Sequence, residues 1–214
     1  MDYQKGKGLP QTIQLHIEAG IAEAAKDPHS LLIFSGGQTR AVTGPADEGG
    51  SYYRVADALN LWGNTNVRTR TATEEFATDS FQNLLYSMCR FKEITSSYPT
   101  KVTVISFSFK RQRFEGLHAP AMHIPAPFFN YIGVDPPAST GFDYQRAADG
   151  ESNTVAQFET DPYGCYTEAL KEKRKGRNPF FRTPWYDLTC PDMKKLMHWC
   201  GPDKFPKDEI QWIL

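Results

Sequence analysis

The amino-acid sequence predicts an α/β fold with a mostly parallel sheet, and three observations support this prediction. Short apolar runs at 30–35, 101–107 and 131–134 have the length of strands. They alternate with segments in which apolar residues recur every three or four positions, as in helices. The first run ends in Gly36-Gly37, which is typical of a strand covered on both faces. This alternation indicates parallel strands joined by right-handed crossovers.

The segments before residue 100 complete the pattern. An apolar helical stripe begins near Pro10 and ends at Asp27-Pro28. Three further elements are expected: a helix over 52–61 with Val55, Leu59 and Trp62 facing inward, an edge strand over 67–71, and a helix over 81–91 capped by Asp79 or Ser80.

The character of the chain changes at residue 138. Residues 138–160 are polar and aperiodic, so they are predicted to form a surface loop. A charged helix is expected over 163–175, and three tryptophans among prolines indicate a tail that packs on the domain. We therefore divide the chain into an α/β core over 1–137 and an irregular C-terminal extension over 138–214.

The composition argues against several classes of partner. The 214 residues carry a net charge of −1, so no overall field favours nucleic acid or an anionic membrane. No apolar run has the length of a membrane span, and the start of the chain has no signal-peptide core. We expect a small-molecule partner and a cytoplasmic location, and the sequence leaves any protein partner unspecified.

The four cysteines are Cys89, Cys165, Cys190 and Cys200, and none forms a closely spaced pair. Their spacing argues against a disulfide framework and against a zinc site. Reduced thiols in a cytosolic protein are therefore expected.

Polar residues follow three of the expected strands, and parallel strands bind ligands at their carboxyl ends. The three loops offer Ser35, Gly36, Gly37 and Gln38; then Glu75 to Asn83, including Ser80; and then Ser106, Lys110 and Arg113. Amide N–H groups at such turns and helix starts favour an anion. We predict that the three loops converge on one ligand site.

Lys110 and Arg113 are the strongest sequence indication that the ligand is anionic. A short basic helix is expected over 108–114, and both cations would lie in its first turns, where they oppose the helix dipole. An anion would compensate for that cost. The alternative is that both side chains simply extend into solvent.

Glu48, Glu75 and Asp79 are the carboxylates available for catalysis near these loops. Each could act as a general base, hold a ribose or cap a helix, and capping is the simplest role for Asp79. No histidine closely follows an expected strand end, so a catalytic histidine is not expected. The sequence also has no metal-ligand cluster, Walker loop or dinucleotide-binding motif.

Taken in order, these motifs resemble the YdcF/SanA/ElyC-like family of domains of unknown function. The matching segments are Ser35-Gly36-Gly37, Asp47-Glu48-Gly49, Glu75 with residues 77–83, and residues 104–106 with Lys110 and Arg113. Residues 161–164 and 176–179 resemble the fungal-type cytosolic branch of that family. The resemblance spans roughly residues 10–180.

This resemblance implies a Rossmann-like three-layer sandwich that binds a nucleotide-type ligand, such as S-adenosylmethionine, at its strand ends. The matching site positions are Gly36, Gly37, Glu48, Glu75, Ser80, Asn83, Ser106 and Arg113. Gln82 and Lys110 depart from the family, which has Glu and His there. The family's opening strand would lie in the middle of the sheet and has no counterpart after Met1. Either the chain is shortened or another segment substitutes for that strand.

The sequence therefore predicts a cytosolic Rossmann-like domain that binds a small anionic or nucleotide-type metabolite. If the protein is an enzyme, Glu48 or Glu75 would act as the base in a transfer or hydrolysis reaction. The alternative hypothesis is a non-catalytic remnant or protein-interaction module whose aromatic tail docks a partner.

Overall fold

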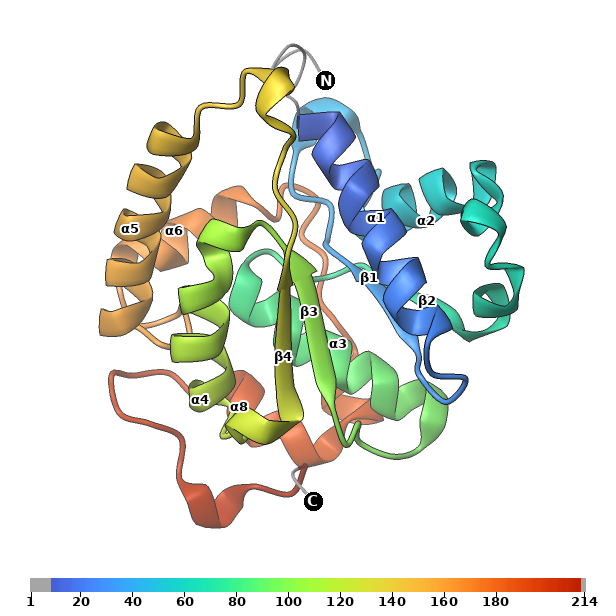
Figure 1. Ribbon diagram of the computed structural model, residues 1–214. Coiled ribbons are helices and arrows are strands. Elements are labelled where there is room, and N and C mark those ends of the chain that lie inside the picture. The colour runs from blue at the N-terminus through green and yellow to red at the C-terminus, as the bar shows by residue number, and fades with distance from the viewer. Residues whose placement is uncertain (1–8, 213–214) are drawn as a thin grey trace.

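The computed structural model describes residues 9–212 and shows a mixed α/β fold with two pairs of parallel strands (Figure 1). Strand β1 (Leu32–Ser35) pairs with β2 (Thr71–Glu74), and Leu32 lies opposite Thr71. Strand β3 (Val102–Ser106) pairs with β4 (Phe129–Gly133), and Val102 lies opposite Phe129. The predicted parallel pairing is therefore confirmed.

Helices surround both pairs. They are α1 (Leu9–Ala25), α2 (Glu48–Ala58), α3 (Ser80–Thr95), α4 (Ala119–Ala121), α5 (Tyr144–Thr160), α6 (Glu168–Gly176), α7 (Tyr186–Thr189) and α8 (Lys194–His198). Short 3₁₀ turns link several of them, and a π-helical turn over Arg113–His118 leads into α4. In Figure 1, α1 lies in front of the β1–β2 pair and α3 lies behind the β3–β4 pair.

The two strand pairs do not join into one sheet within residues 9–212. The second edges of β1 and β3 carry no strand. Helix α1 contacts both pairs at Gly20. A Cβ atom added there would lie 3.3 Å from Leu32 Cδ1 of β1 and 3.9 Å from Ile105 Cδ1 of β3. Every residue of β3 is only half-buried, although strands covered on both faces are normally buried. The expected continuous sheet is therefore not formed by this part of the chain.

Two hydrophobic cores hold these elements together. The smaller core packs α1 and α2 on the first pair, with Ile17, Ile21 and Phe34 buried. The larger core joins α3 and β3 to the C-terminal segments, and it buries Phe158 and Trp212. The end of the aromatic tail is thus part of the interior, whereas Phe181 and Trp185 remain exposed.

A disulfide between Cys165 and Cys200 corrects the expectation of four reduced thiols. The two cysteines are 35 residues apart, so sequence spacing could not reveal the pair. Cys89 and Cys190 are free and buried, as predicted for reduced thiols. Within residues 9–212, no helix has the length and apolar character needed to cross a membrane, and no group of His, Cys, Asp or Glu is arranged for a metal ion.

Helix α2 starts earlier than predicted, because Asp47 rather than Ser51 is its N-cap and accepts a hydrogen bond from the Gly50 amide. The residues that face the core also differ from the expectation. Val55 and Leu59, expected to face inward, are exposed, and Ala56 is buried instead. The expected strand over 67–71 was also wrong, because Thr65–Arg70 forms a 3₁₀ helix and the strand starts at Thr71.

Two other segments also differ from the expectation. Residues 144–160 were predicted to lie in a surface loop and instead form α5, which buries only Glu151 and Phe158 and so shows little apolar periodicity. The expected basic helix over 108–114 is present but irregular, with a 3₁₀ turn over Ser108–Lys110, two α-helical residues and then the π-helical turn.

Candidate functional site

The Gly36-Gly37 loop is closed by hydrogen bonds within the protein. Its amides donate to the carbonyl oxygens of Glu74 and Ala77, at 2.9 and 2.8 Å. Its carbonyls accept from the first two amides of α2, because Gly49 donates to Gly36 and Glu48 donates to Gly37. These two loop amides are therefore occupied, and the expected amide cradle for an anion is not present at this loop.

The glycines are explained by close packing. A Cβ atom at Gly37 would lie 2.8 Å from the Ala77 carbonyl oxygen, and one at Gly49 would lie 2.5 Å from that of Phe34. Backbone atoms cannot move aside cheaply, so only glycine fits. The motif brings the start of α2 against the ends of β1 and β2, and in this way it positions Glu48.

Glu48 and Glu75, the two predicted bases, have different surroundings. Glu48 lies against Gly36 and accepts a hydrogen bond from Thr39 Oγ1 at 2.7 Å. Glu75 accepts from Thr73 Oγ1 at 2.8 Å, which directs its carboxylate toward its own strand. Within residues 9–212, Glu48 and Glu75 do not hydrogen-bond to each other or to a shared group. Of the two, only Glu48 has an electrostatic link to the predicted cation Lys110.

Glu74 is a buried carboxyl group that the sequence argument missed. It ends β2 with 1% of its surface exposed, and burial raises its pKa to about 7. Its Oε2 lies 2.6 Å from Ser35 Oγ, which is also 3.1 Å from Asn83 Oδ1. This chain of contacts brings two predicted ligand residues, Ser35 and Asn83, together. The sequence did offer an indication of this group, because Glu74 ends a strand and directly precedes the predicted Glu75.

The basic side of the site joins the third loop to the C-terminal extension. Lys110 and Arg113 are near Arg177, since the positive charge of Arg177 lowers the pKa of both. Lys173 also lies near Arg113 and Arg177, and its pKa is lowered first by burial and then by these two cations. Four positive side chains therefore converge, two of them from α6 and the residue that follows it.

Arg113 is 7% exposed and forms an ion pair with Glu151 of α5. Its Nε lies 2.9 Å from Glu151 Oε1, but the angles are not those of a hydrogen bond. Burial raises the pKa of Glu151 and Arg113 opposes that change. For Arg113, burial lowers the pKa and Glu151 opposes it. The pair is thus held together with part of its hydrogen-bonding capacity unused.

Lys110 is half-buried beside the Phe107 ring, with Nζ 5.0 Å from the ring centroid. Burial, and then the charge of Arg113, lowers its pKa to about 8. Lys110 does lie in the first turn of a helical segment, because the 3₁₀ turn over Ser108–Lys110 continues directly into helical residues 111–121. Desolvation and neighbouring cations add to the cost of holding Lys110 charged.

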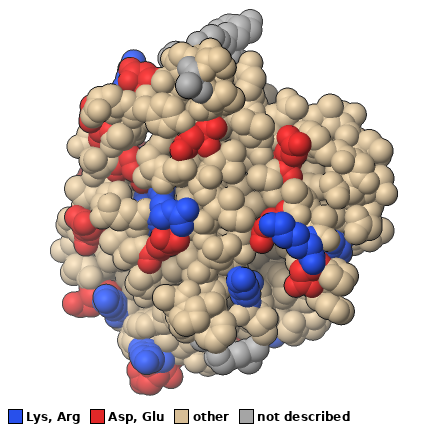
Figure 2. Space-filling model, viewed as in Figure 1, with Lys and Arg blue, Asp and Glu red and all other residues tan. Residues whose placement is uncertain are grey.

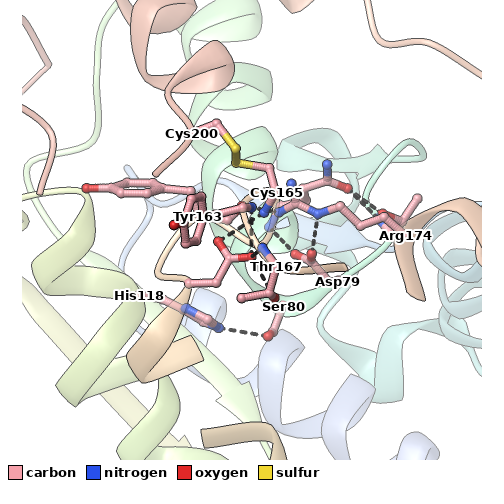
Figure 3. A network of polar contacts seen from close by, with 12 residues as sticks. Asp79, Ser80, His118, Tyr163, Cys165, Thr167, Arg174 and Cys200 are labelled. Atoms are coloured by element: carbon pink, nitrogen blue, oxygen red, sulfur yellow. Dashed lines mark hydrogen bonds and ion pairs between the residues drawn. A yellow bond between two sulfur atoms is a disulfide. The ribbon is translucent and has the colours of Figure 1, made fainter. Parts of the chain in front are cut away.

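Ser80 and His118 form a contact that the sequence argument did not foresee (Figure 3). Ser80 Oγ lies 2.7 Å from His118 Nε2, and His118 is fully buried, with no partner for Nδ1 among residues 9–212. Burial, followed by the charge of Arg113, lowers the pKa of His118 to about 3. A histidine that resists a proton so strongly is a poor general base, so this pair serves to orient the Ser80 hydroxyl.

Arg174 of α6 anchors the C-terminal extension on the start of α3 (Figure 3). It donates to Asp79 Oδ2 and to the Tyr163 carbonyl oxygen, both at 2.5 Å. Burial would raise the pKa of Asp79, but Arg174 outweighs it, and the net pKa is lowered. Gly164 makes room for this contact, because a Cβ atom there would lie 2.7 Å from Arg174 Nη2. As predicted, Asp79 caps α3 and accepts from the Gln82 amide.

Asp161, which is fully buried, organises the loop before α6. Its carboxylate accepts hydrogen bonds from the amides of Cys165, Tyr166 and Thr167. The loop is also held to the C-terminal segment by the disulfide of Cys165 (Figure 3). The orientation of α6, and so of Lys173 and Arg177, is set by these contacts.

The remaining predicted site residues lie at the strand ends. Ser106 ends β3, where its carbonyl accepts from the Val134 amide. Burial raises the pKa of Tyr131, and a hydrogen bond with the Ser106 side chain opposes that change. Gln38 is half-buried in the glycine loop. Figure 2 shows positive and negative side chains interspersed on the face in view, without a broad patch of one sign. The basic cluster is therefore a local feature rather than part of a charged surface.

Comparisons with known proteins identify one informative relative. The chain is 32% identical over 218 residues to "Uncharacterized protein YOR238W" of Saccharomyces cerevisiae. The alignment covers 82% of this chain and 72% of the yeast protein. No family model and no solved structure matches the chain. At this identity and coverage, the chain belongs to the same family as yeast YOR238W.

Proposed function

We propose that the protein binds a small anionic metabolite where the carboxyl end of β3 meets α6. The observation that carries this proposal is the convergence of Lys110, Arg113, Lys173 and Arg177. The nearby carboxylates are Glu151, which pairs with Arg113, Asp79, which pairs with Arg174, and Glu48, which acts on Lys110. Among the described residues, Lys110, Lys173 and Arg177 form no ion pair of their own.

Phosphate is the group that best suits this cluster. Lysine binds phosphate as a point charge, and arginine binds it through a planar fork of donors. A phosphate-bearing nucleotide is therefore favoured over S-adenosylmethionine, because the positive sulfonium of that ligand would be repelled by the same side chains.

We also propose that the fold is of the Rossmann-like, YdcF-like kind. All four strands run parallel within their pairs, with helices on two sides and a cation cluster at the strand ends. Ligands of doubly wound sheets bind at that edge. In this proposal the two pairs are parts of one sheet, and the edges of β1 and β3 face the position of a further strand.

If a reaction takes place, Glu48 is the best-placed carboxylate. It lies against Gly36 at the end of β1 and within electrostatic reach of Lys110. Transfer or hydrolysis of a phosphorylated substrate fits this arrangement, because cations stabilise the charge that develops on the phosphoryl oxygens. The alternative is an aromatic tail that docks a partner. Phe205 and Trp212 are buried in the protein's own core, so Phe181 and Trp185 are the exposed rings that could serve it.

Calorimetry with ADP and with inorganic pyrophosphate tests the proposal. We expect saturable binding by the unchanged protein and a loss of about tenfold in affinity for Lys110→Ala and for Lys173→Ala. Lys171→Ala is the matched control, because Lys171 lies on the same helix and is half exposed beside Glu168. Equal affinities in all four proteins, or no binding to the unchanged protein, would remove the proposed anion site.

A further inference from the structure

A cavity separate from the basic cluster lies between the start of α3 and the segment that follows α6. Its volume is about 230 Å³, which is several times the share of one liquid water and suits a small organic molecule. The lining residues are Phe76, Thr78, Gln82, Tyr86, Arg174, Lys175, Asn178, Arg182, Thr183 and Pro184. Helix α6 therefore contributes to two places, with Lys173 in the basic cluster and Lys175 in this cavity.

The cavity is lined by hydrogen-bond donors with few acceptors to match. Gln82 Oε1 accepts from the amide and the hydroxyl of Thr78, so its NH₂ group remains available as a donor. Arg182 stacks on Phe76, with the guanidinium carbon 4.5 Å from the ring centroid. Arg182 forms no ion pair with any other residue in the range 9–212. No aspartate or glutamate lines the cavity.

Tyr86 provides an independent indication of a ligand. Its side chain lines the cavity and is 9% exposed, and its phenol makes no hydrogen bond with any described residue. Its hydroxyl is near Arg174, whose charge acts on it. The hydroxyl oxygen itself is open to the cavity, so it can hydrogen-bond to a ligand that enters. The burial that raises the pKa of Tyr86 also keeps the phenol protonated, so it can donate to an acceptor.

The apolar wall indicates the shape of the missing partner. Phe76 is held edge-to-face by Trp185 at 4.9 Å, so its ring is fixed in orientation. Pro184 adds a second rigid surface. The positive charge of Arg174 is already matched by Asp79, which leaves Arg182 as the cation without an acid partner. A ligand with one anionic group and a small flat body would satisfy both the donors and this wall.

We propose that this cavity binds a small organic carboxylate. Its oxygens would accept hydrogen bonds from the Tyr86 hydroxyl, the Gln82 amide and the Arg182 guanidinium, and its body would lie against Phe76. Arginine binds carboxylates through two parallel N–H donors, which matches the charge that lacks a partner here. The site is separate from the proposed phosphate site and does not depend on it.

Titration with benzoate, followed by calorimetry, tests this proposal. We expect saturable binding by the unchanged protein. Tyr86→Phe removes a single oxygen atom and should weaken benzoate binding about fivefold to tenfold. It should leave the denaturant midpoint unchanged, because the phenol has no partner to lose within the protein. Arg182→Gln should weaken binding at least tenfold, because it removes the charged donor.

Two controls separate this site from the basic cluster. Tyr144→Phe removes an exposed phenol from α5 and should not change the affinity for benzoate. Lys110→Ala should also leave benzoate binding unchanged. The proposal is overturned if the unchanged protein does not bind benzoate, if Tyr86→Phe and Arg182→Gln both bind it as well as the unchanged protein, or if Lys110→Ala abolishes binding. Displacement of benzoate by inorganic phosphate at equal concentration would overturn the choice of a carboxylate.

Discussion

The two sides of the strand-end region differ in how their polar groups are satisfied. On the β1–β2 side, the amides of Gly36 and Gly37 and the carboxyl of Glu74 are paired within the protein. On the β3 side, Lys110 and Arg177 have no ion-pair partner among the described residues. A glycine-rich turn that looks like a ligand loop can thus be a packing device, and groups left without partners are the better guide to binding.

The two sides also differ in which parts of the chain build them. The glycine turn joins residues 36–49 to the end of β2 and the residues that follow it, because Gly36 and Gly37 donate to Glu74 and Ala77. The basic side joins residues 110–113 to Glu151 and to Lys173, which lie on α5 and α6. Four predictions sharpen this contrast, and they are ordered by expected effect.

The largest effect is expected from the buried ion pair on the basic side. Arg113→Met leaves Glu151 buried without its partner, so the free energy of unfolding at neutral pH should fall by about 3–5 kcal/mol. Denaturant titration measures this change. The double variant Arg113→Met/Glu151→Leu should recover most of the loss. A fall of under about 1 kcal/mol in the single variant would show that the pair is not buried as described.

On the other side, Glu74 should make stability depend on pH. Its pKa is about 7 in the folded protein, against roughly 4.3 in an unfolded chain, so the folded state binds the proton more tightly. The resulting stabilisation is complete below about pH 4 and is lost as the pH rises to 7, by an amount on the order of 3 kcal/mol.

Glu74→Gln should remove this dependence, since the amide can keep the backbone contacts of Oε1 and donate to Ser35. We expect the variant to be more stable than the unchanged protein at pH 8 and nearly equal to it at pH 4.5. Unfolding titrations at both pH values measure the difference. A variant that is less stable at pH 8 would contradict the assignment.

Gly37→Ala tests whether the glycine turn serves packing rather than binding. The added methyl would meet the Ala77 carbonyl, so we expect a loss of about 1–3 kcal/mol in stability. The affinity of the folded variant for ADP should stay within about twofold, because the amide is already bonded to the protein. Gly150→Ala, in open space on α5, is the control and should stabilise slightly. If Gly37→Ala lost ADP binding while staying folded, the hypothesis that the amides of this loop bind the anion would be supported again.

The smallest effect is a pH dependence of binding on the basic side. The pKa of Lys110 is about 8, so the side chain loses its charge as the pH rises from 7 to 9. The affinity for ADP should fall about fivefold to tenfold over that range, since one charged contact is lost. Calorimetry at the two pH values measures it. Lys110→Arg should remove the dependence, and a dependence that persists in this variant would implicate another group.

The elements that the sequence predicted best have local causes. The helix that begins at Leu9 has a regular apolar stripe, the run 102–106 is β-branched and continuous, and α3 begins at an aspartate cap. Errors occurred where a distant contact decided the local structure. Helix α5 is an example, since its buried face consists of Phe158 in the aromatic core and Glu151 on Arg113.

For the candidate site, the sequence likewise predicted the residues that are close together in the chain and missed those that distant contacts bring in. Lys110 and Arg113 could be named in advance because two cations in a short loop are visible in the sequence. Lys173 and Arg177 could not, because a charged helix end normally faces solvent. Their place beside Arg113 depends on Arg174, Asp79 and the cap at Asp161.

By itself, the sequence determined the alternation of helices and strands, the parallel pairing within each βαβ unit and the kinship with yeast YOR238W. Periodicity, capping and identity are properties of neighbouring or aligned residues. Only the tertiary structure decided which strand edges meet, which cysteines pair and which charges gather. These depend on contacts between residues tens of positions apart, whose free energies arise when burial removes both partners from water.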